Sequence, residues 1–154
     1  MDTFFGIPWI GVPLVAIVGA AISIYVPYAL VAYGRFATGF DPETFKAPRA
    51  AFDRLPDYAK RATWAHQNSF EVFAPFAAAC LMCFVTAPHP FTVLGIPADI
   101  SNALASLIFV LSRLSYAAAY ILDQPAWRSL SWAVSVTCTG SLMLTALRGL
   151  TTTL

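Results

Sequence analysis

Four long apolar stretches constrain the fold of this chain more than any other feature of its sequence. They cover residues 7–34, 60–86, 100–121 and 126–148. A helix rises about 1.5 Å per residue, so each stretch is long enough to cross the ~30 Å hydrocarbon core of a bilayer. Inside that core, only helices and closed barrels satisfy their backbone hydrogen-bonding groups. We therefore expect an all-α membrane protein, a four-transmembrane-helix bundle that forms a single domain over residues 1–154.

The composition supports a chain that is surrounded by lipid. Hydrophobic residues make up 58% of the chain and charged residues only 11%, whereas a soluble domain carries about 25% charged residues. The formal net charge is +1 and the nine lysines and arginines are scattered, which excludes a nucleic-acid surface as partner. Membrane lipids are the partner that this composition predicts.

Histidines and cysteines offer no metal site by their spacing, because no set of His, Cys or carboxylate residues has the pattern of metal ligands. The cysteines lie in apolar stretches, where we expect structural thiols (Cys80, Cys83 and Cys138). We expect His66 to pack between helices and His89, in a proline-rich loop, to be solvated. Trp127 and Trp132 lie where aromatic residues line the membrane interface.

Basic residues orient the bundle. Six of them surround the first loop: Arg35, Lys46, Arg49, Arg54, Lys60 and Arg61. Arg128 adjoins the third loop, whereas the second loop, residues 86–99, has no lysine or arginine. By the positive-inside rule, the first and third loops face the cytoplasm and both termini are extracytoplasmic, with Arg148 the only basic residue on that face. We expect a multi-pass protein of a bacterial inner membrane or an endomembrane.

The second apolar stretch opens with an unusually polar segment, RATWAHQNSFEVFAPF, residues 61–76. Four of its side chains share one helix face, within an arc of about 80°: Arg61, Trp64, Asn68 and Glu71. Glu71 lies about 15 Å further along the helix than Arg61, near the middle of the membrane. An ionised carboxylate is costly at that depth, so Glu71 requires a partner.

The third stretch offers such a partner. Its polar and aromatic residues recur at steps of three and four, which places them on one helix face: Asn102, Ser106, Phe109, Arg113, Tyr116 and Tyr120. Because the second and third helices run antiparallel, Glu71 and Arg113 lie at similar depth. We expect them to pair, within one subunit or between adjacent subunits. Such a pair can serve function or architecture, and the sequence leaves both readings open.

Two motifs resemble a known family. Ala65-His66-x-Asn68-x-x-Glu71 followed by Pro75-Phe76, together with Arg113-Leu-x-Tyr116-x-x-x-Tyr120 and Arg128, is similar to the signature of the MAPEG superfamily. These are membrane-associated proteins of eicosanoid and glutathione metabolism, and they include the microsomal glutathione transferases. The chain length, the four spans and the long first loop fit as well.

The resemblance implies a homotrimer that holds glutathione between neighbouring subunits, near the cytoplasmic face. It implies that the polar contacts to the peptide come from Asn68, Glu71, Tyr116 and Tyr120, and that Arg128 activates the thiol. Family members that are catalytic usually have an arginine directly before the Ala65 position, where this chain has Trp64. Arg61, one turn earlier, is the cation that could replace it, and we include Arg61 and Arg113 among the candidate binding residues.

Two functions follow from the resemblance. The first is a membrane-embedded glutathione transferase or peroxidase, which uses glutathione as co-substrate and a lipophilic small molecule as substrate. The alternative is a non-catalytic lipid- or thiol-binding membrane protein of the same fold. Trp64 favours the alternative, whereas Tyr116, Tyr120 and Arg128 favour the enzyme.

Overall fold

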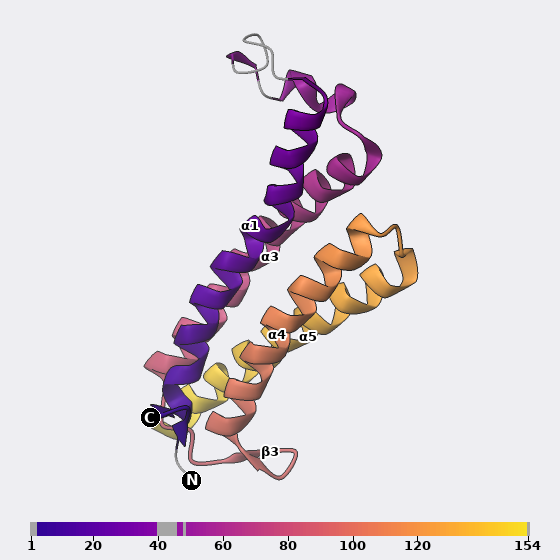
Figure 1. Ribbon diagram of the computed structural model, residues 1–154. Coiled ribbons are helices and arrows are strands. Elements are labelled where there is room, and N and C mark those ends of the chain that lie inside the picture. Colours follow the sequence, from indigo (N-terminus) through magenta and orange to yellow (C-terminus); the bar gives the residue numbers. More distant parts are fainter. Residues whose placement is uncertain (1–2, 40–45, 48, 154) are drawn as a thin grey trace.

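Four long helices form the body of the protein in the computed structural model, which describes residues 3–39, 46–47 and 49–153 (Figure 1). They are α1 (Val12–Ala37), α3 (Asp57–Val85), α4 (Ala98–Ile121) and α5 (Pro125–Thr153). Short 3-10 turns precede α1 and α3, at Trp9–Gly11 and Ala50–Arg54. Each of the four helices is long and apolar enough to cross a membrane, so the described residues confirm the four spans that the sequence predicts.

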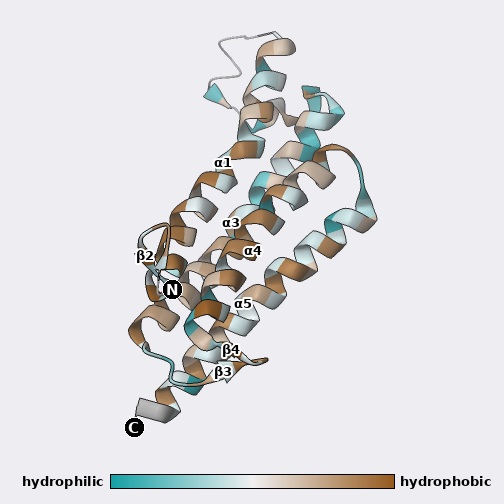
Figure 2. Cartoon of the chain, turned by 60° about the horizontal axis from the view of Figure 1, so that its bottom comes forward, coloured by the Kyte–Doolittle hydropathy of each residue, from teal (hydrophilic) through white to brown (hydrophobic). Residues whose placement is uncertain are grey.

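The two ends of the bundle differ in character. The described part of the linker between α1 and α3 (residues 38–39, 46–47 and 49–56) and the turn between α4 and α5 (residues 122–124) lie at one end, which we name the linker end. The other end, the hairpin end, carries two short β-hairpins and both ends of the chain (Figure 1). Apolar residues run along all four helices, and hydrophilic residues gather at the linker end (Figure 2).

The two hairpins share a six-residue pattern that the sequence analysis missed. Strands β1 (Thr3–Phe4) and β2 (Ile7–Pro8) come from TFFGIP, and β3 (Thr92–Val93) and β4 (Ile96–Pro97) come from TVLGIP. In both, threonine pairs with proline across an antiparallel two-residue turn. Both turn residues have positive φ, 49° and 79° in the first hairpin and 53° and 80° in the second, which is the backbone of a type I′ turn. Glycine at the second position adopts this conformation without strain.

Prolines sit at helix starts and inside helices. Pro125 is the first residue of α5, a position where proline is tolerated because it removes no helical hydrogen bond. Asp123 has a φ of 57° and is separated from α5 by Gln124, so Gln124 directly precedes the helix. Pro27 and Pro75 lie inside α1 and α3, which both continue past them.

The largest apolar core lies where all four helices meet. Phe76 of α3 and Phe109 of α4 stack face to face at its centre, with ring centroids 3.6 Å apart. The three cysteines belong to this core, and all three are buried free thiols, which agrees with a structural role. Small side chains such as Ala20 and Ala146 line its remaining walls and allow the helices to approach closely.

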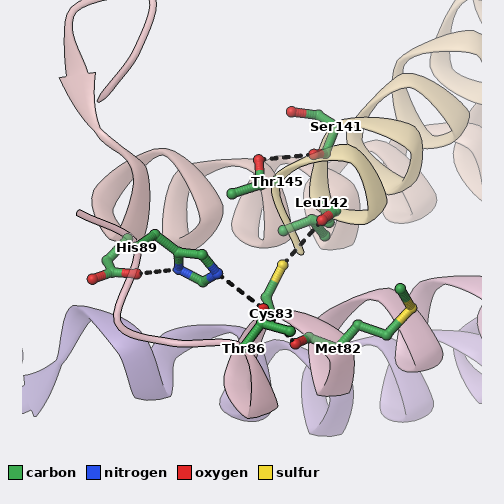
Figure 3. A network of polar contacts seen from close by, with 8 residues as sticks. Met82, Cys83, Thr86, His89, Ser141, Leu142 and Thr145 are labelled. Atoms are coloured by element: carbon green, nitrogen blue, oxygen red, sulfur yellow. Dashed lines mark hydrogen bonds and ion pairs between the residues drawn. The ribbon is translucent and has the colours of Figure 1, made fainter. Parts of the chain in front are cut away.

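His89 is buried, so the expectation that it is solvated is wrong. The residue is 5% exposed, with Nδ1 2.6 Å from Oδ1 of Asp99 and Nε2 3.1 Å from Oγ1 of Thr86 (Figure 3). A Cβ atom on Gly149 would lie 2.9 Å from the His89 ring, so α5 approaches the ring only because residue 149 has no side chain. We name Thr86, His89 and Asp99 the His89 clasp, since it ties the second loop to the ends of α3, α4 and α5.

The clasp predicts an asymmetry between two aspartates that occupy equivalent positions, the first turns of α3 and α4. Asp99→Ala removes the acceptor of a buried imidazole N–H and should lower the free energy of unfolding by about 1–3 kcal/mol. Asp57→Ala removes only an interaction with the helix dipole and should cost about 0.3–1 kcal/mol. Unfolding of both variants in detergent micelles checks this, and equal losses would contradict the clasp.

Candidate functional site

A cavity of about 530 Å³ opens in the linker half of the bundle, between α3, α4 and α5. Its walls are Asn68, Tyr116, Tyr120, Arg128, Ser129, Trp132 and Ala133. Four of the seven residues that the sequence singles out as a site therefore meet around one space. In the described part of the chain, no group of three or more His, Cys, Asp or Glu side chains could hold a metal ion.

Arg113 lies beneath this cavity and organises its floor. The side chain is 2% exposed, and Nη2 donates to Oδ1 of Asn68 at 2.9 Å and to Oγ of Ser69 at 3.3 Å. The guanidinium also lies 4.1 Å from the centroid of the Tyr116 ring. Arg113 thus fixes one residue from each side of the cavity, the amide of Asn68 and the phenol of Tyr116.

The predicted ion pair between Arg113 and Glu71 does not form within one chain. Asn68 stands between them, because its Nδ2 donates to Oε2 of Glu71 at 3.3 Å while its Oδ1 accepts from Arg113. Glu71 and Arg113 do lie at similar depth, as predicted, but the two side chains do not point toward each other. Arg113 faces Asn68 and Ser69, and at about 100° per residue Glu71 points roughly 160° away from Ser69. Glu71 is exposed on the surface of the single chain.

Arg128 brings a half-buried cation to the rim of the cavity. It lies in the first turn of α5, with its guanidinium 4.8 Å from the centroid of the Tyr120 ring. The rings of Tyr116 and Tyr120 meet edge to face at 5.6 Å. No carboxylate of a described residue lies within 4 Å of Arg128, so its charge is available to an anionic ligand.

Trp64 occupies the place where an arginine is expected. It is 44% exposed, and its ring lies 6.3 Å from Tyr120 and 5.8 Å from Phe52. Trp64 also lines a second, larger cavity of about 790 Å³ between α1, the Ala50–Arg54 turn and α3. The indole therefore lines the larger cavity and contacts Tyr120, which lines the smaller one, so an aromatic surface stands there in place of a cation.

The larger cavity is polar and aromatic, and α3 is the only helix that it shares with the smaller cavity. Arg35 and Gln67 are among its lining residues, and Nε of Arg35 is buried without a hydrogen-bond partner among the described residues. His66 lines it too, with Nδ1 donating to the carbonyl of Ile24 at 2.7 Å. His66 thus packs between α3 and α1, as the sequence predicts.

Arg61 does not line either cavity, in contrast to its proposed role as a replacement cation. Its Nε donates to the carbonyl of Ile121 at 3.0 Å. Ile121 is the last residue of α4, and the final carbonyls of a helix have no partner in the helix itself. Arg61 therefore caps α4, and its charge complements the negative end of that helix.

Part of the α5 wall was not predicted from the sequence. Trp132, which we expected at the membrane interface, lines the cavity together with Ser129. Trp127 donates from its indole N–H to Oγ of Ser115 at 2.8 Å, and Ser115 lies 3.1 Å from Oγ of Ser131. This chain of hydrogen bonds fixes the start of α5 against α4. The spacing of Arg128 and Trp132, one turn apart, is the only sequence signal that could have identified this wall.

The Arg113 contacts predict coupling between two residues. Asn68→Leu should lower the free energy of unfolding by about 1–3 kcal/mol, because it leaves a buried guanidinium without its shortest hydrogen bond. In an Arg113→Met background, the same change should cost much less, since no buried charge remains to be satisfied. Gln67→Leu, on the neighbouring exposed position, is the control. Thermal unfolding of the full mutant cycle measures the coupling, and additive losses would disprove it.

Comparison with known proteins places this site in a family. The family model described as the MAPEG family matches residues 12–148, a range that contains the whole cavity lined by Asn68 and Arg128. No curated protein and no solved structure matches the chain significantly. The match covers most of the chain, from the first residue of α1 into the last two turns of α5. The chain belongs to the MAPEG family.

Proposed function

We propose that the protein is a membrane-embedded glutathione transferase or peroxidase that acts on lipophilic electrophiles. MAPEG membership fits a membrane glutathione transferase or a role in eicosanoid metabolism. The observation that carries the proposal is the Arg128 guanidinium, which faces the cavity beside two phenols and an amide and has no carboxylate of a described residue within 4 Å. Such a site suits an anionic peptide that carries a thiol.

Arg128 would act on the thiol of bound glutathione. A free thiol has a pKa of about 8.5, so only a few per cent is thiolate at pH 7. A guanidinium in the first turn of a helix adds its own charge to the positive end of the helix dipole and favours the anion. The thiolate then attacks the electrophile, a sulfur–carbon bond forms, and the leaving group departs with its electron pair. The protein supplies no covalent nucleophile of its own.

The remaining residues of the cavity would bind and orient the peptide. The amide of Asn68 and the hydroxyls of Tyr116 and Tyr120 offer hydrogen bonds to its amides and carboxylates. Glu71 lies on the same face of α3 as Asn68 and offers a carboxylate to the glutathione ammonium. Arg113 would act indirectly, since it contacts Asn68 and Tyr116 from below and holds them in place.

We also propose that the chain assembles as a homotrimer. Glu71 is exposed on the single chain at a depth where lipid would solvate it poorly. A neighbouring copy would cover it. The face of that copy with the larger cavity brings Arg35 and Gln67, so glutathione would lie between subunits. A lipophilic substrate would enter the same crevice directly from the bilayer.

The proposed orientation places the linker end in the cytoplasm. Most of the basic residues lie there or near it, whereas Arg148 is the only lysine or arginine in the hairpin half of the described residues. By the positive-inside rule, both termini would be extracytoplasmic, in a bacterial inner membrane or an endomembrane. The glutathione cavity would then open toward the cytoplasm.

A second candidate function is a non-catalytic lipid- or thiol-binding protein of the same fold. The observation that favours it is Trp64, whose indole contacts Tyr120 where catalytic members usually have a cation. An aromatic wall favours an apolar ligand over a doubly charged peptide. The two functions assign different roles to Arg128 and Trp64, so substitutions of these two residues distinguish them.

Arg128→Ala should lower the conjugation rate of glutathione with a lipophilic chlorinated aromatic by about tenfold or more at pH 7. The deficit should shrink at higher pH, where the thiol ionises without help. Rates for wild type and variant across pH check this, with Lys60→Ala as a control that removes a cation outside the cavity. A deficit that stays constant with pH would contradict thiol activation by Arg128.

Trp64→Arg should tighten glutathione binding by about 1–2 kcal/mol, because it restores a cation beside the carboxylates of the peptide. Trp64→Gln is the matched control, since it removes the indole without adding charge. Binding measured by titration calorimetry separates the two variants. If wild type shows no thiol-dependent turnover and Trp64→Arg restores only binding, the non-catalytic function is the correct one.

A further inference from the structure

A second site lies at the hairpin end, far from the cavity around Arg128. A groove of about 480 Å³ runs between the second loop and α5. Two of its lining residues, Phe91 and Val93, come from the loop and strand β3, and the others come from α5: Thr137, Gly140, Ser141, Leu144, Thr145 and Arg148. The α5 residues recur at steps of three or four, so they form one continuous face of the helix.

The floor of the groove is hollow and mainly apolar, which suits an acyl chain. A Cβ atom on Gly140 would meet nothing within 4 Å, so the helix surface is hollow there. The hydroxyls of Thr137 and Thr145 donate to carbonyls of their own helix, at 2.9 and 3.0 Å, and Figure 3 shows the Thr145 bond. Leu144 is 70% exposed. The floor therefore presents mainly hydrocarbon to the bilayer.

A cation closes one end of the groove. The Arg148 guanidinium lies 4.5 Å from the centroid of the Phe91 ring, and no carboxylate of a described residue is within 4 Å of it. Asp99, the acidic residue nearby in the fold, is already bound to His89. The charge of Arg148 is therefore not neutralised by a carboxylate of the described residues. Arg148 lies near the end of α5, from where a long cationic side chain can reach the headgroup layer.

The His89 clasp holds this cation in place. The Phe91 ring contacts His89 edge to face at 5.8 Å, and α5 packs on His89 at Gly149, the residue next to Arg148. The guanidinium carbon lies over the Phe91 ring. The guanidinium N–H groups make no hydrogen bond with a described residue, so they can donate to two oxygen atoms at once. A phosphate group accepts such a pair of hydrogen bonds.

We propose that this groove binds one anionic phospholipid from the bilayer. Its phosphate accepts hydrogen bonds from Arg148, and an acyl chain lies along α5 over Gly140 and Ser141. Leu94, at the tip of the neighbouring hairpin, is 98% exposed and extends into the same interfacial layer. The site is independent of the transferase function, because it shares no residue with the cavity around Arg128.

Native mass spectrometry tests the proposal on the purified full-length protein. The protein is mixed in detergent with equal amounts of dioleoyl phosphatidylglycerol and dioleoyl phosphatidylcholine. Wild type should retain the anionic lipid about fivefold more strongly, the effect of one cation near a membrane surface. Arg148→Gln should abolish this preference and Arg148→Lys should keep most of it. Lys60→Gln, which removes a cation at the linker end, should leave it unchanged.

Substitutions that block the groove test the proposed acyl-chain site. Gly140→Leu adds a side chain whose Cβ meets nothing within 4 Å, so we expect it to fold normally and to lower the retention of both lipids. Ser141→Leu is a second block at the adjacent position. Equal retention of both lipids by wild type, an unchanged preference in Arg148→Gln, or undiminished retention in both groove variants would overturn the proposal. Disulfide-linked copies of Ser141→Cys would also overturn it, because the groove would then be an interface between subunits.

Discussion

The hydrogen bond from buried Arg113 to Asn68 is the interaction on which the candidate site depends. A guanidinium inside a membrane bundle is costly, so it persists only where the surrounding groups hold it firmly. Here α3 supplies Asn68 and Ser69, and α4 supplies the ring of Tyr116. The same contacts orient the amide and the phenol that face the cavity. The residue that joins the two helices therefore also sets the geometry of the binding surface, with Arg128 placed above it from the start of α5.

Periodicity predicted much of this arrangement, because depth and helix face are simple functions of residue number. It gave the four spans and the stripe on α4, whose members from Asn102 to Tyr116 are buried. Periodicity did not predict which of several neighbouring residues a side chain contacts. Glu71 and Arg113 lie at matching depth, but whether they meet depends on how the helix is rotated about its axis. In the structure, Asn68 lies between them and bonds to both. Periodicity also gave no signal for Arg61, whose partner is a backbone carbonyl.

The hairpin end shows a second limit of sequence reasoning. A proline-rich loop usually lies on the surface, yet His89 is buried because Asp99 and Thr86 bind it and Gly149 makes room for it. The hairpins TFFGIP and TVLGIP are too short to show a strand period. Their apolar tips, Phe5 and Leu94, are the most exposed large hydrophobic side chains among the described residues. The proposed glutathione site and the proposed lipid site thus lie at opposite ends of one bundle.

Titration calorimetry of wild type with glutathione at pH 7, in two buffers of different ionisation enthalpy, tests the central claim most directly. The comparison counts the protons released on binding as well as the affinity. If Arg128 stabilises the thiolate, binding should be saturable and should release close to one proton per glutathione. The thiol of free glutathione is almost entirely protonated at that pH. Saturable binding without proton release, or no binding at all, would contradict the account.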